Sequence, residues 1–195
     1  MRITGGAMRG RVLSGKVGAG VRPTKSRVRE AMFSMVGQQL DGWTVLDAFG
    51  GSGILGFEAL SRGAKSLTTC ELNRAAAYQI RASAAGLKLT VDVRTRDAAQ
   101  VLSSGSWDLV LLDPPYDADA LEWAERAAPA VRQLLVVEHR PGVAWPEQIG
   151  SLVLEKVRRH GDSALAFYRT GELPGAEEGA VVGQDLGVVE DDGCG

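Results

Sequence analysis

Residues 44–56 read TVLDAFGGSGILG, in which a short apolar run leads into a cluster of glycines. The run 44–48 is typical of a buried strand, and residues 54–64 carry apolar side chains at helical spacing up to a glycine cap at Gly63. A strand that passes through a glycine-rich turn into a helix is the first unit of a doubly wound sheet. This stretch therefore predicts an α/β fold.

The alternation of strand and helix patterns continues along the chain. Helices are expected at 73–86, opened by Asn73 and closed by Gly86, and at 121–131. Strands are expected at 66–72, 89–97, 107–116 and 134–140, and as a terminal pair at 152–170. We therefore expect a mostly parallel, doubly wound Rossmann-like sheet that ends in an antiparallel strand.

Charge and composition divide the chain into three regions. Residues 1–42 predict a glycine-punctuated hairpin and a helix from about Thr24 to Val36, as a basic extension of the catalytic fold at 43–170. Residues 1–44 carry eight Lys or Arg against two acids, which suits a surface that follows phosphates or is simply solvated. Residues 171–195 hold seven acids and regularly spaced glycines, and we expect them to form a flexible tail.

Composition excludes several classes of protein. The chain has 195 residues, 45% of them apolar, with neither an apolar run of membrane-spanning length nor a secretory leader at its start. The two cysteines lie far apart and the histidines number two, so neither a disulfide framework nor a metal site is expected. We expect a cytoplasmic protein.

Four acids stand where predicted strands end: Asp47, Glu71, Asp97 and Asp113. Ligands of open α/β sheets bind at that edge. Glycines 51, 53 and 56 match G-x-G-x-x-G, and Glu71 follows twenty residues after Gly51, the spacing at which an acid accepts from ribose hydroxyls. The motif alone suits a nicotinamide dinucleotide as well as an adenosyl cofactor.

Asp47 argues against the dinucleotide. A carboxylate directly before the glycines would repel a pyrophosphate, whereas it suits the sulfonium and amino groups of S-adenosylmethionine. Asp97 is placed to accept from an adenine amino group, and it also fits as the N-cap of a helix.

Asp113-Pro114-Pro115-Tyr116 is the most specific motif in the chain. The prolines end an apolar strand and remove N–H donors, so an Asp113 oxygen and the Pro114 carbonyl can accept both hydrogens of one exocyclic amine. The Tyr116 ring offers a stacking face for a flipped base. A plain turn would explain the prolines, but not their position after a buried strand beside a nucleoside-type loop.

These segments resemble the RsmD family of bacterial 16S ribosomal RNA guanine-N2 methyltransferases, which have a class I S-adenosylmethionine-dependent fold. The motifs at 47–53 and 113–116 carry the resemblance, together with MRITGG (1–6), RGR (9–11), RPTKSRVREAMF (22–33), GFEALSRGA (56–64) and HGDS (160–163). The resemblance spans about residues 1–170. Gly50 departs from the alanine usual in the family, which we expect to add flexibility.

The resemblance implies S-adenosylmethionine as cofactor and 16S ribosomal RNA, free or in an assembling small subunit, as partner. We also expect the protein to be a monomer. It assigns the methionine and ribose end to Asp47, Gly51, Ser52 and Gly53, the ribose hydroxyls to Glu71, the adenine to Asp97, and further cofactor contacts to Thr24, Phe49, Leu72 and Ala98. It gives the target guanine to Asp113, Pro114, Pro115 and Tyr116, and the RNA phosphates to Arg9, Arg11, Arg22, Lys25, Arg27 and Arg29.

Other functions explain less of the sequence. A DNA adenine-N6 methyltransferase shares the Asp-Pro-Pro-Tyr logic but usually needs a separate recognition region, and methylation of protein glutamine favours Asn at the first motif position. A nicotinamide oxidoreductase leaves Asp47 and Asp-Pro-Pro-Tyr unexplained. A non-catalytic RNA-binding module accounts for the basic extension alone.

Overall fold

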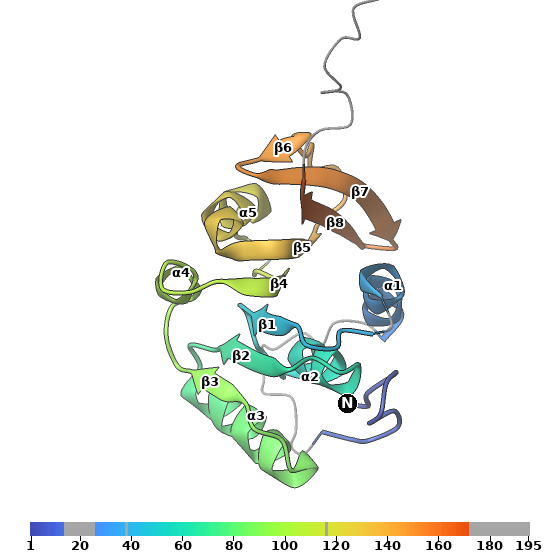
Figure 1. The fold of residues 1–195 in the computed structure, drawn as a ribbon, viewed down its shortest axis with the longest axis vertical. Helices are drawn as coiled ribbons and strands as arrows, with labels where there is room; N and C mark the ends of the chain where they lie inside the picture. The colour runs from blue at the N-terminus through green and yellow to red at the C-terminus, as the bar shows by residue number, and fades with distance from the viewer. Residues whose placement is uncertain (14–25, 38, 116, 172–195) are drawn as a thin grey trace, which may run out of the picture.

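The computed structural model describes residues 1–13, 26–37, 39–115 and 117–171. One sheet of eight strands runs through it in the order β3-β2-β1-β4-β5-β8-β7-β6 (Figure 1). The strands are β1 (Thr44–Asp47), β2 (Ser66–Cys70), β3 (Asp92–Arg94), β4 (Trp107–Leu112), β5 (Val131–His139), β6 (Gln148–Ile149), β7 (Leu152–His160) and β8 (Ser163–Thr170). The helices are α1 (Ser26–Val36), α2 (Ile54–Ser61), α3 (Arg74–Leu87), α4 (Ala98–Leu102) and α5 (Ala120–Ala127), which a 3-10 turn (Ala128–Ala130) follows.

Strands β1 to β5 pair in parallel, and β5, β8, β7 and β6 pair antiparallel. The expected doubly wound sheet is therefore confirmed, with an antiparallel end formed by the hairpin of β7 and β8. That hairpin turns at Gly161, as the sequence predicts.

Element ends differ from the sequence prediction in several places: α5 ends at Ala127 and not at 131, β2 at Cys70 and not at 72, and β4 at Leu112 and not at 116. Helix α3 does not close at Gly86: it runs to Leu87, which packs on a core cluster, and Lys88 supplies the left-handed cap at φ 58°. Strand β3 covers only the middle of the expected strand 89–97. The expected N-terminal hairpin contains a single antiparallel bridge, between Arg2 and Val12.

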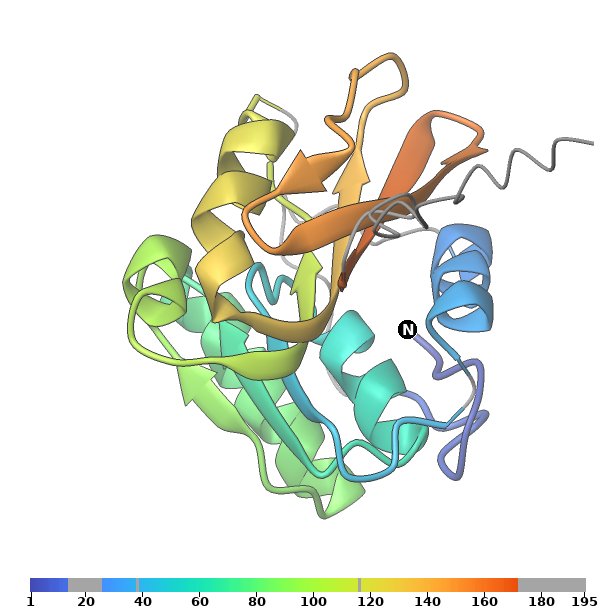
Figure 2. The same cartoon turned by 45° about the horizontal axis from the view of Figure 1, so that its top comes forward.

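Helices cover both faces of the sheet (Figures 1 and 2), and a hydrophobic layer lies between the helices and the strands on each face. On one face, Ala98, Val101, Ala120 and Ala124 of α4 and α5 pack on alternate residues of the strands. On the other face, α1 and α2 pack on the remaining residues of the strands, among them Leu109, Leu111 and Val136. Because side chains alternate along a strand, β1, β2, β4, β5 and β8 contribute to both layers.

A buried charge network joins the N-terminal segment to α1 and α2. Glu58 of α2 is fully buried. Its carboxylate accepts from the N–H and hydroxyl of Thr4 at 2.7 and 2.8 Å, from Arg29 Nε at 3.0 Å and from Arg62. The Arg29 guanidinium also donates to the Arg2 carbonyl oxygen at 3.0 Å. Three segments far apart in sequence thus share one carboxylate.

This network corrects the expectation that Arg29 meets RNA. Arg29 is only 3% exposed and its guanidinium faces inward to Glu58. Burial by itself would raise the pKa of Glu58, but hydrogen bonds from Arg62 and Thr4 outweigh it and hold the pKa below its usual value. Arg29 is therefore a structural residue.

In the part of the chain that the structure describes, no helix has the length and apolar character needed to cross a membrane.

Candidate active site

The site lies where the strand order reverses, between β1 and β4. Asp47 ends β1 and Asp113 directly follows β4, so the two neighbouring parallel strands bring these carboxylates to the same edge of the sheet. Ligands of doubly wound sheets bind at such a reversal, because the connecting helices diverge there and leave a crevice. The glycine turn at 47–53 and residues 113–115 of the second motif are thus adjacent in space.

The turn from β1 into α2 requires glycine at Gly53. This residue has φ 77°, and a Cβ there would lie 2.9 Å from the ring of Phe57. The Gly53 N–H donates to the Gly50 carbonyl, which closes the turn at 2.5 Å. The backbone can therefore come close to a ligand at this point.

Gly50 has a packing role, and the gain in flexibility expected from the sequence stays a prediction. Its N–H donates to the Cys70 carbonyl at 2.7 Å. A Cβ on this buried residue would lie 2.5 Å from the Thr69 hydroxyl. The close approach to β2 therefore explains the glycine.

Glu71 joins the glycine turn to the start of α3. Its two carboxylate oxygens accept from the backbone N–H groups of Gly51 and Asn73, both at 2.7 Å. These bonds fix the orientation of the carboxylate at the end of β2. Each oxygen can accept more than one hydrogen bond, so both remain able to accept from hydroxyl donors.

Asp47 is a strongly perturbed carboxyl group at this edge. One of its oxygens accepts from the Gly56 N–H at 3.2 Å, and the other, Oδ1, is buried with no hydrogen-bond partner among the described residues. Burial is the main cause that raises the pKa of Asp47 to about 7; the negative charges of Asp113 and Glu71 contribute to this rise, and the hydrogen bond from the Gly56 N–H opposes it. The site therefore favours a positively charged group beside Asp47.

The other expected cofactor residues occupy varied positions. Asp97 caps α4 by accepting from the Ala99 N–H at 2.7 Å, which confirms the helix-cap interpretation, and Ala98 is buried behind it. Leu72 is 66% exposed although apolar. Phe49 packs edge-on against Trp123 with ring centres 4.9 Å apart. Ser52 follows Gly51 in the turn, and Thr24 lies outside the described residues.

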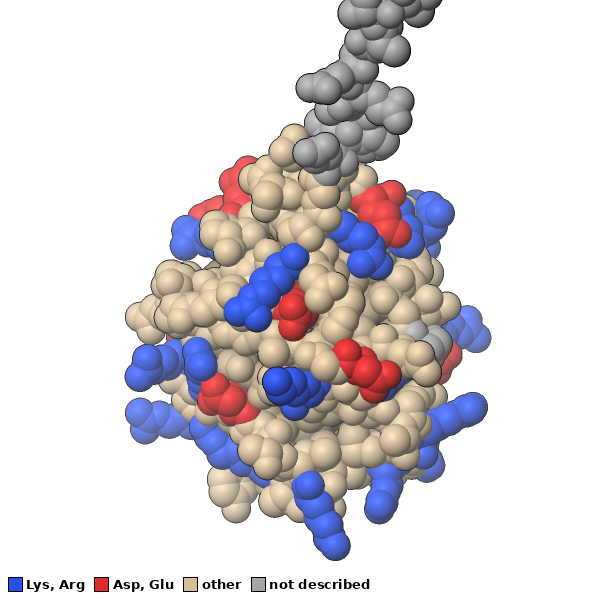
Figure 3. Space-filling model, viewed as in Figure 1, with Lys and Arg blue, Asp and Glu red and all other residues tan. Residues whose placement is uncertain are grey.

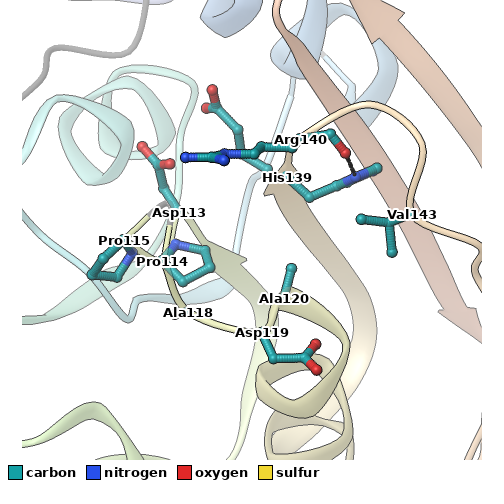
Figure 4. A pocket seen from close by; sticks show the side chains of 10 residues that line it. Asp113, Pro114, Pro115, Ala118, Asp119, Ala120, His139, Arg140 and Val143 are labelled. Atoms are coloured by element: carbon teal, nitrogen blue, oxygen red, sulfur yellow. Dashed lines mark hydrogen bonds between the residues drawn. The ribbon is translucent and has the colours of Figure 1, made fainter.

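A pocket opens beside Asp113, between the ends of β4 and β5. It is lined by Asp113, Pro114, Pro115, Ala118, Asp119, Ala120, Glu138, His139, Arg140 and Val143. Figure 4 shows the Arg140 side chain extending toward the Asp113 carboxylate, with the two prolines below it. Tyr116 lies outside the described residues. The pocket therefore combines an apolar floor with charged groups on one side.

The sequence interpretation missed Glu138 and Arg140. It treated residues 134–140 only as a buried strand, although β5 ends next to the strand that carries the Asp-Pro-Pro-Tyr motif. The sequence did hold a signal for them: two charged residues stand at the end of an apolar strand that is expected to lie beside the strand with the motif.

His139 is held in place by neighbours on both sides. Its Nε2 accepts from the Trp145 indole N–H at 3.0 Å, and its Nδ1 lies 2.7 Å from the Arg140 carbonyl oxygen. This pairing defines a neutral ring with the proton on Nδ1. Burial lowers the pKa of His139, which is consistent with the neutral form.

Three of the arginines expected to meet RNA are exposed: Arg9, Arg11 and Arg27. Arg22 and Lys25 lie outside the described residues.

Among the described residues no group of three or more His, Cys, Asp and Glu side chains could hold a metal ion. Burial raises the pKa of the Cys70 thiol to about 12, so it remains protonated and is not a nucleophile.

Comparisons with known proteins agree with this geometry. A family model described as "Conserved hypothetical protein 95" matches residues 1–169. The "Putative rRNA methyltransferase YlbH" of Bacillus subtilis is 32% identical over 87% of this chain and 98% of its own length. The "Ribosomal RNA small subunit methyltransferase D" of Haemophilus influenzae is 36% identical over 64% of this chain and 68% of its own length.

A solved structure has the same architecture. The "Putative methyltransferase yhhF" of Escherichia coli superposes with a TM-score of 0.75 and 32% identity, over 87% of this chain and 97% of that one.

Proposed function

This chain belongs to the family described as conserved hypothetical protein 95, as the resemblance to the RsmD family predicted, and from that premise we propose its activity. It transfers a methyl group from S-adenosylmethionine to the exocyclic N2 amine of a guanine in small-subunit ribosomal RNA. The observation that carries the proposal is the placement of Asp113 and Pro114 beside the buried Asp47, at the reversal of strand order. The names of the matched relatives support an rRNA substrate.

The residues around the glycine turn fit S-adenosylmethionine. When bound, this cofactor supplies an electrophilic methyl group on a positively charged sulfur. Asp47 has a buried oxygen without a partner among the described residues, in a site that carries two further carboxylates, so a cation is favourable there. Glu71 is oriented to accept from ribose hydroxyls, while Gly51, Ser52, Gly53, Phe49 and Leu72 line the approach and Asp97 holds the adenine end.

The acceptor amine is held by the ends of β4. Its two hydrogens are accepted by an Asp113 carboxylate oxygen and the Pro114 carbonyl, which leaves the nitrogen lone pair directed toward the methyl carbon. Pro115 fixes the turn and Tyr116 supplies the ring on which the base stacks. After transfer the excess proton passes from the amine to the Asp113 carboxylate or to solvent.

The decisive test is transfer of labelled methyl from S-adenosylmethionine to undermethylated bacterial 16S RNA and to small subunits, with nucleoside analysis of the product. Label in N2-methylguanosine supports the proposal. Label in N6-methyladenine of a DNA control would instead establish the DNA adenine-N6 activity. If the protein binds the cofactor but labels neither RNA nor DNA, the fold and the cofactor are correctly assigned and the proposed methyl acceptor is wrong.

The affinity for S-adenosylmethionine is expected to depend on pH through Asp47. Because the pKa of Asp47 is raised to about 7, the group is neutral below that pH and negatively charged above it. A cationic ligand prefers the charged form, so the affinity should rise up to about tenfold per pH unit below the pKa and level off above it. Calorimetric titration across this range measures the effect.

Two variants separate the role of Asp47 from that of other acids. Asp47→Asn should bind S-adenosylmethionine more weakly, with an affinity that does not change with pH. Asp117→Asn removes an exposed carboxyl group and should keep the pH dependence of the wild-type affinity. A flat profile for the wild-type protein would contradict the assignment of Asp47 to the cationic group.

The exposed arginines of residues 1–29 are proposed to contact RNA phosphates. Figure 3 shows Lys and Arg side chains spread over the viewed face with acids between them, so the positive charge does not form a single block there. Arg11→Glu and Arg27→Glu should each weaken RNA binding and reduce the slope of log affinity against log salt by about one. Filter binding at several salt concentrations measures both quantities.

Arg126→Glu is the matched control for these reversals. Arg126 is exposed on α5 and pairs with Glu122, away from the N-terminal residues. An equal change of slope in this variant would mean that net charge, and not the N-terminal surface, decides RNA affinity.

A further inference from the structure

The end of β5 places a second carboxylate next to Asp113. Leu112 of β4 lies opposite Val137 of β5, so Asp113 and Glu138 follow as neighbours at the same sheet edge. Leu112 and Val137 both belong to the layer covered by α4 and α5. Because successive side chains of a strand point to opposite faces, Glu138 turns toward the face covered by α1 and α2, and Asp113, directly after β4, lines the same pocket as Glu138.

Glu138 lines the pocket beside Asp113, which is called the acceptor pocket from here on because the proposed function places the acceptor amine there. It is 8% exposed and lines the pocket together with Asp113, Pro114 and Arg140. Burying a carboxylate is costly unless charged or hydrogen-bonding groups meet it. The Arg140 guanidinium, which extends across the pocket toward Asp113 in Figure 4, supplies positive charge at this edge.

We infer that Glu138 makes the pocket specific for guanine. The inference rests on the proposed function and deepens it. Guanine carries an N1–H donor directly beside the N2 amine, whereas the N1 atom of adenine is an acceptor. A carboxylate is acceptor-only, so Glu138 next to Asp113 accepts from N1–H while Asp113 and Pro114 hold the amine. An acceptor at N1 would face the carboxylate without a proton between them, which disfavours adenine.

His139, which lies between Glu138 and Arg140 in the sequence, cannot accept the N1–H of guanine. Its ring nitrogens are engaged by Trp145 and the Arg140 carbonyl, and β-strand alternation turns it to the opposite face from Glu138. Its packing partner Trp145 contacts the layer covered by α4 and α5, which agrees with that orientation. Glu138 is thus the carboxylate of β5 that lines the pocket with Asp113.

The test compares two bases that both carry the 2-amino group. The methylated guanine is located first by nucleoside mapping, and a synthetic RNA fragment is made with guanine or 2,6-diaminopurine at that position. The second base lacks the N1 hydrogen. We expect wild-type kcat/KM to be roughly 10- to 100-fold lower for 2,6-diaminopurine, because the charged hydrogen bond is lost. Glu138→Gln should lower transfer to guanine and bring the ratio close to one, since an amide can also donate.

Controls separate specificity from folding. S-adenosylhomocysteine affinity should stay unchanged in Glu138→Gln, which shows that the variant is folded, and Glu125→Gln, on the exposed face of α5, should keep the wild-type base preference. If Glu138→Gln does not fold, the wild-type ratio for the two bases decides the question.

The outcomes distinguish the inference from the proposed function. Equal use of both bases by wild-type protein, or an unchanged preference in Glu138→Gln, overturns the role of Glu138 and leaves guanine methylation standing. No transfer to any guanine by wild-type protein overturns the proposed function and this inference with it.

Discussion

Replacing Asp113 by alanine is expected to reduce methyl transfer by roughly 10²–10⁴-fold while S-adenosylhomocysteine still binds. The carboxylate follows β4 and lines the pocket, so in the proposed mechanism its loss removes one of the two acceptors that orient the amine. The proposal assigns cofactor binding to Asp47 and Glu71 on the neighbouring strands, so this binding should persist. Single-turnover transfer and calorimetry measure the two effects separately.

Asp117→Ala is the control for this variant. It removes one carboxylate from the same loop at an exposed position outside the pocket, and transfer should stay close to the wild-type rate. A parallel loss of cofactor affinity in Asp113→Ala would contradict the assignment of Asp113 to the acceptor amine.

Replacing Glu58 by glutamine is expected to lower the free energy of unfolding by about 3–5 kcal/mol, because the change leaves buried arginine charge without its partner. Glu58 is fully buried and accepts from Thr4, Arg29 and Arg62, so both guanidinium groups lose their counter-charge together. The N-terminal segment and α1 should loosen from α2. Urea denaturation measures the loss of stability.

The chain contains a matched control for this effect. Glu122 and Arg126 form a second pair with the same i,i+4 spacing on a helix, but both side chains are more than half exposed. Glu122→Gln should change the free energy of unfolding by less than about 1 kcal/mol. Similar losses in the two glutamine variants would show that burial of the Glu58 network contributes nothing.

Local sequence patterns predicted the sheet and its order of elements well, for a physical reason. Apolar strands, the glycine turn after Asp47 and the caps at Asn73 and Asp97 are set by interactions within a few residues. Predicted boundaries were less accurate where packing extends an element. Helix α3 continues past Gly86 to Leu87, because the Leu87 side chain packs on a core cluster, and it ends at the cap residue Lys88.

The position of the site was also predictable, since parallel strands bring their carboxyl ends to one edge. Asp47, Glu71 and Asp113 were identified because each follows an apolar strand in the sequence. Glu138 and Arg140 also lie at a strand end but without a motif, and their relation to Asp113 depends on the register of β4 and β5.

The sequence by itself determined the doubly wound fold, the glycine turn and the acids at the sheet edge, because periodicity and turn chemistry are local. Only the tertiary structure decided which charged side chains are exposed and able to meet a ligand. Arg29 lies among exposed arginines in the sequence, yet it is buried against a carboxylate 29 residues away. It also decided that Glu138 stands beside Asp113 and that Asp47 is buried enough to raise its pKa to about 7. Burial and strand register arise from packing between distant segments, so local patterns do not reveal them.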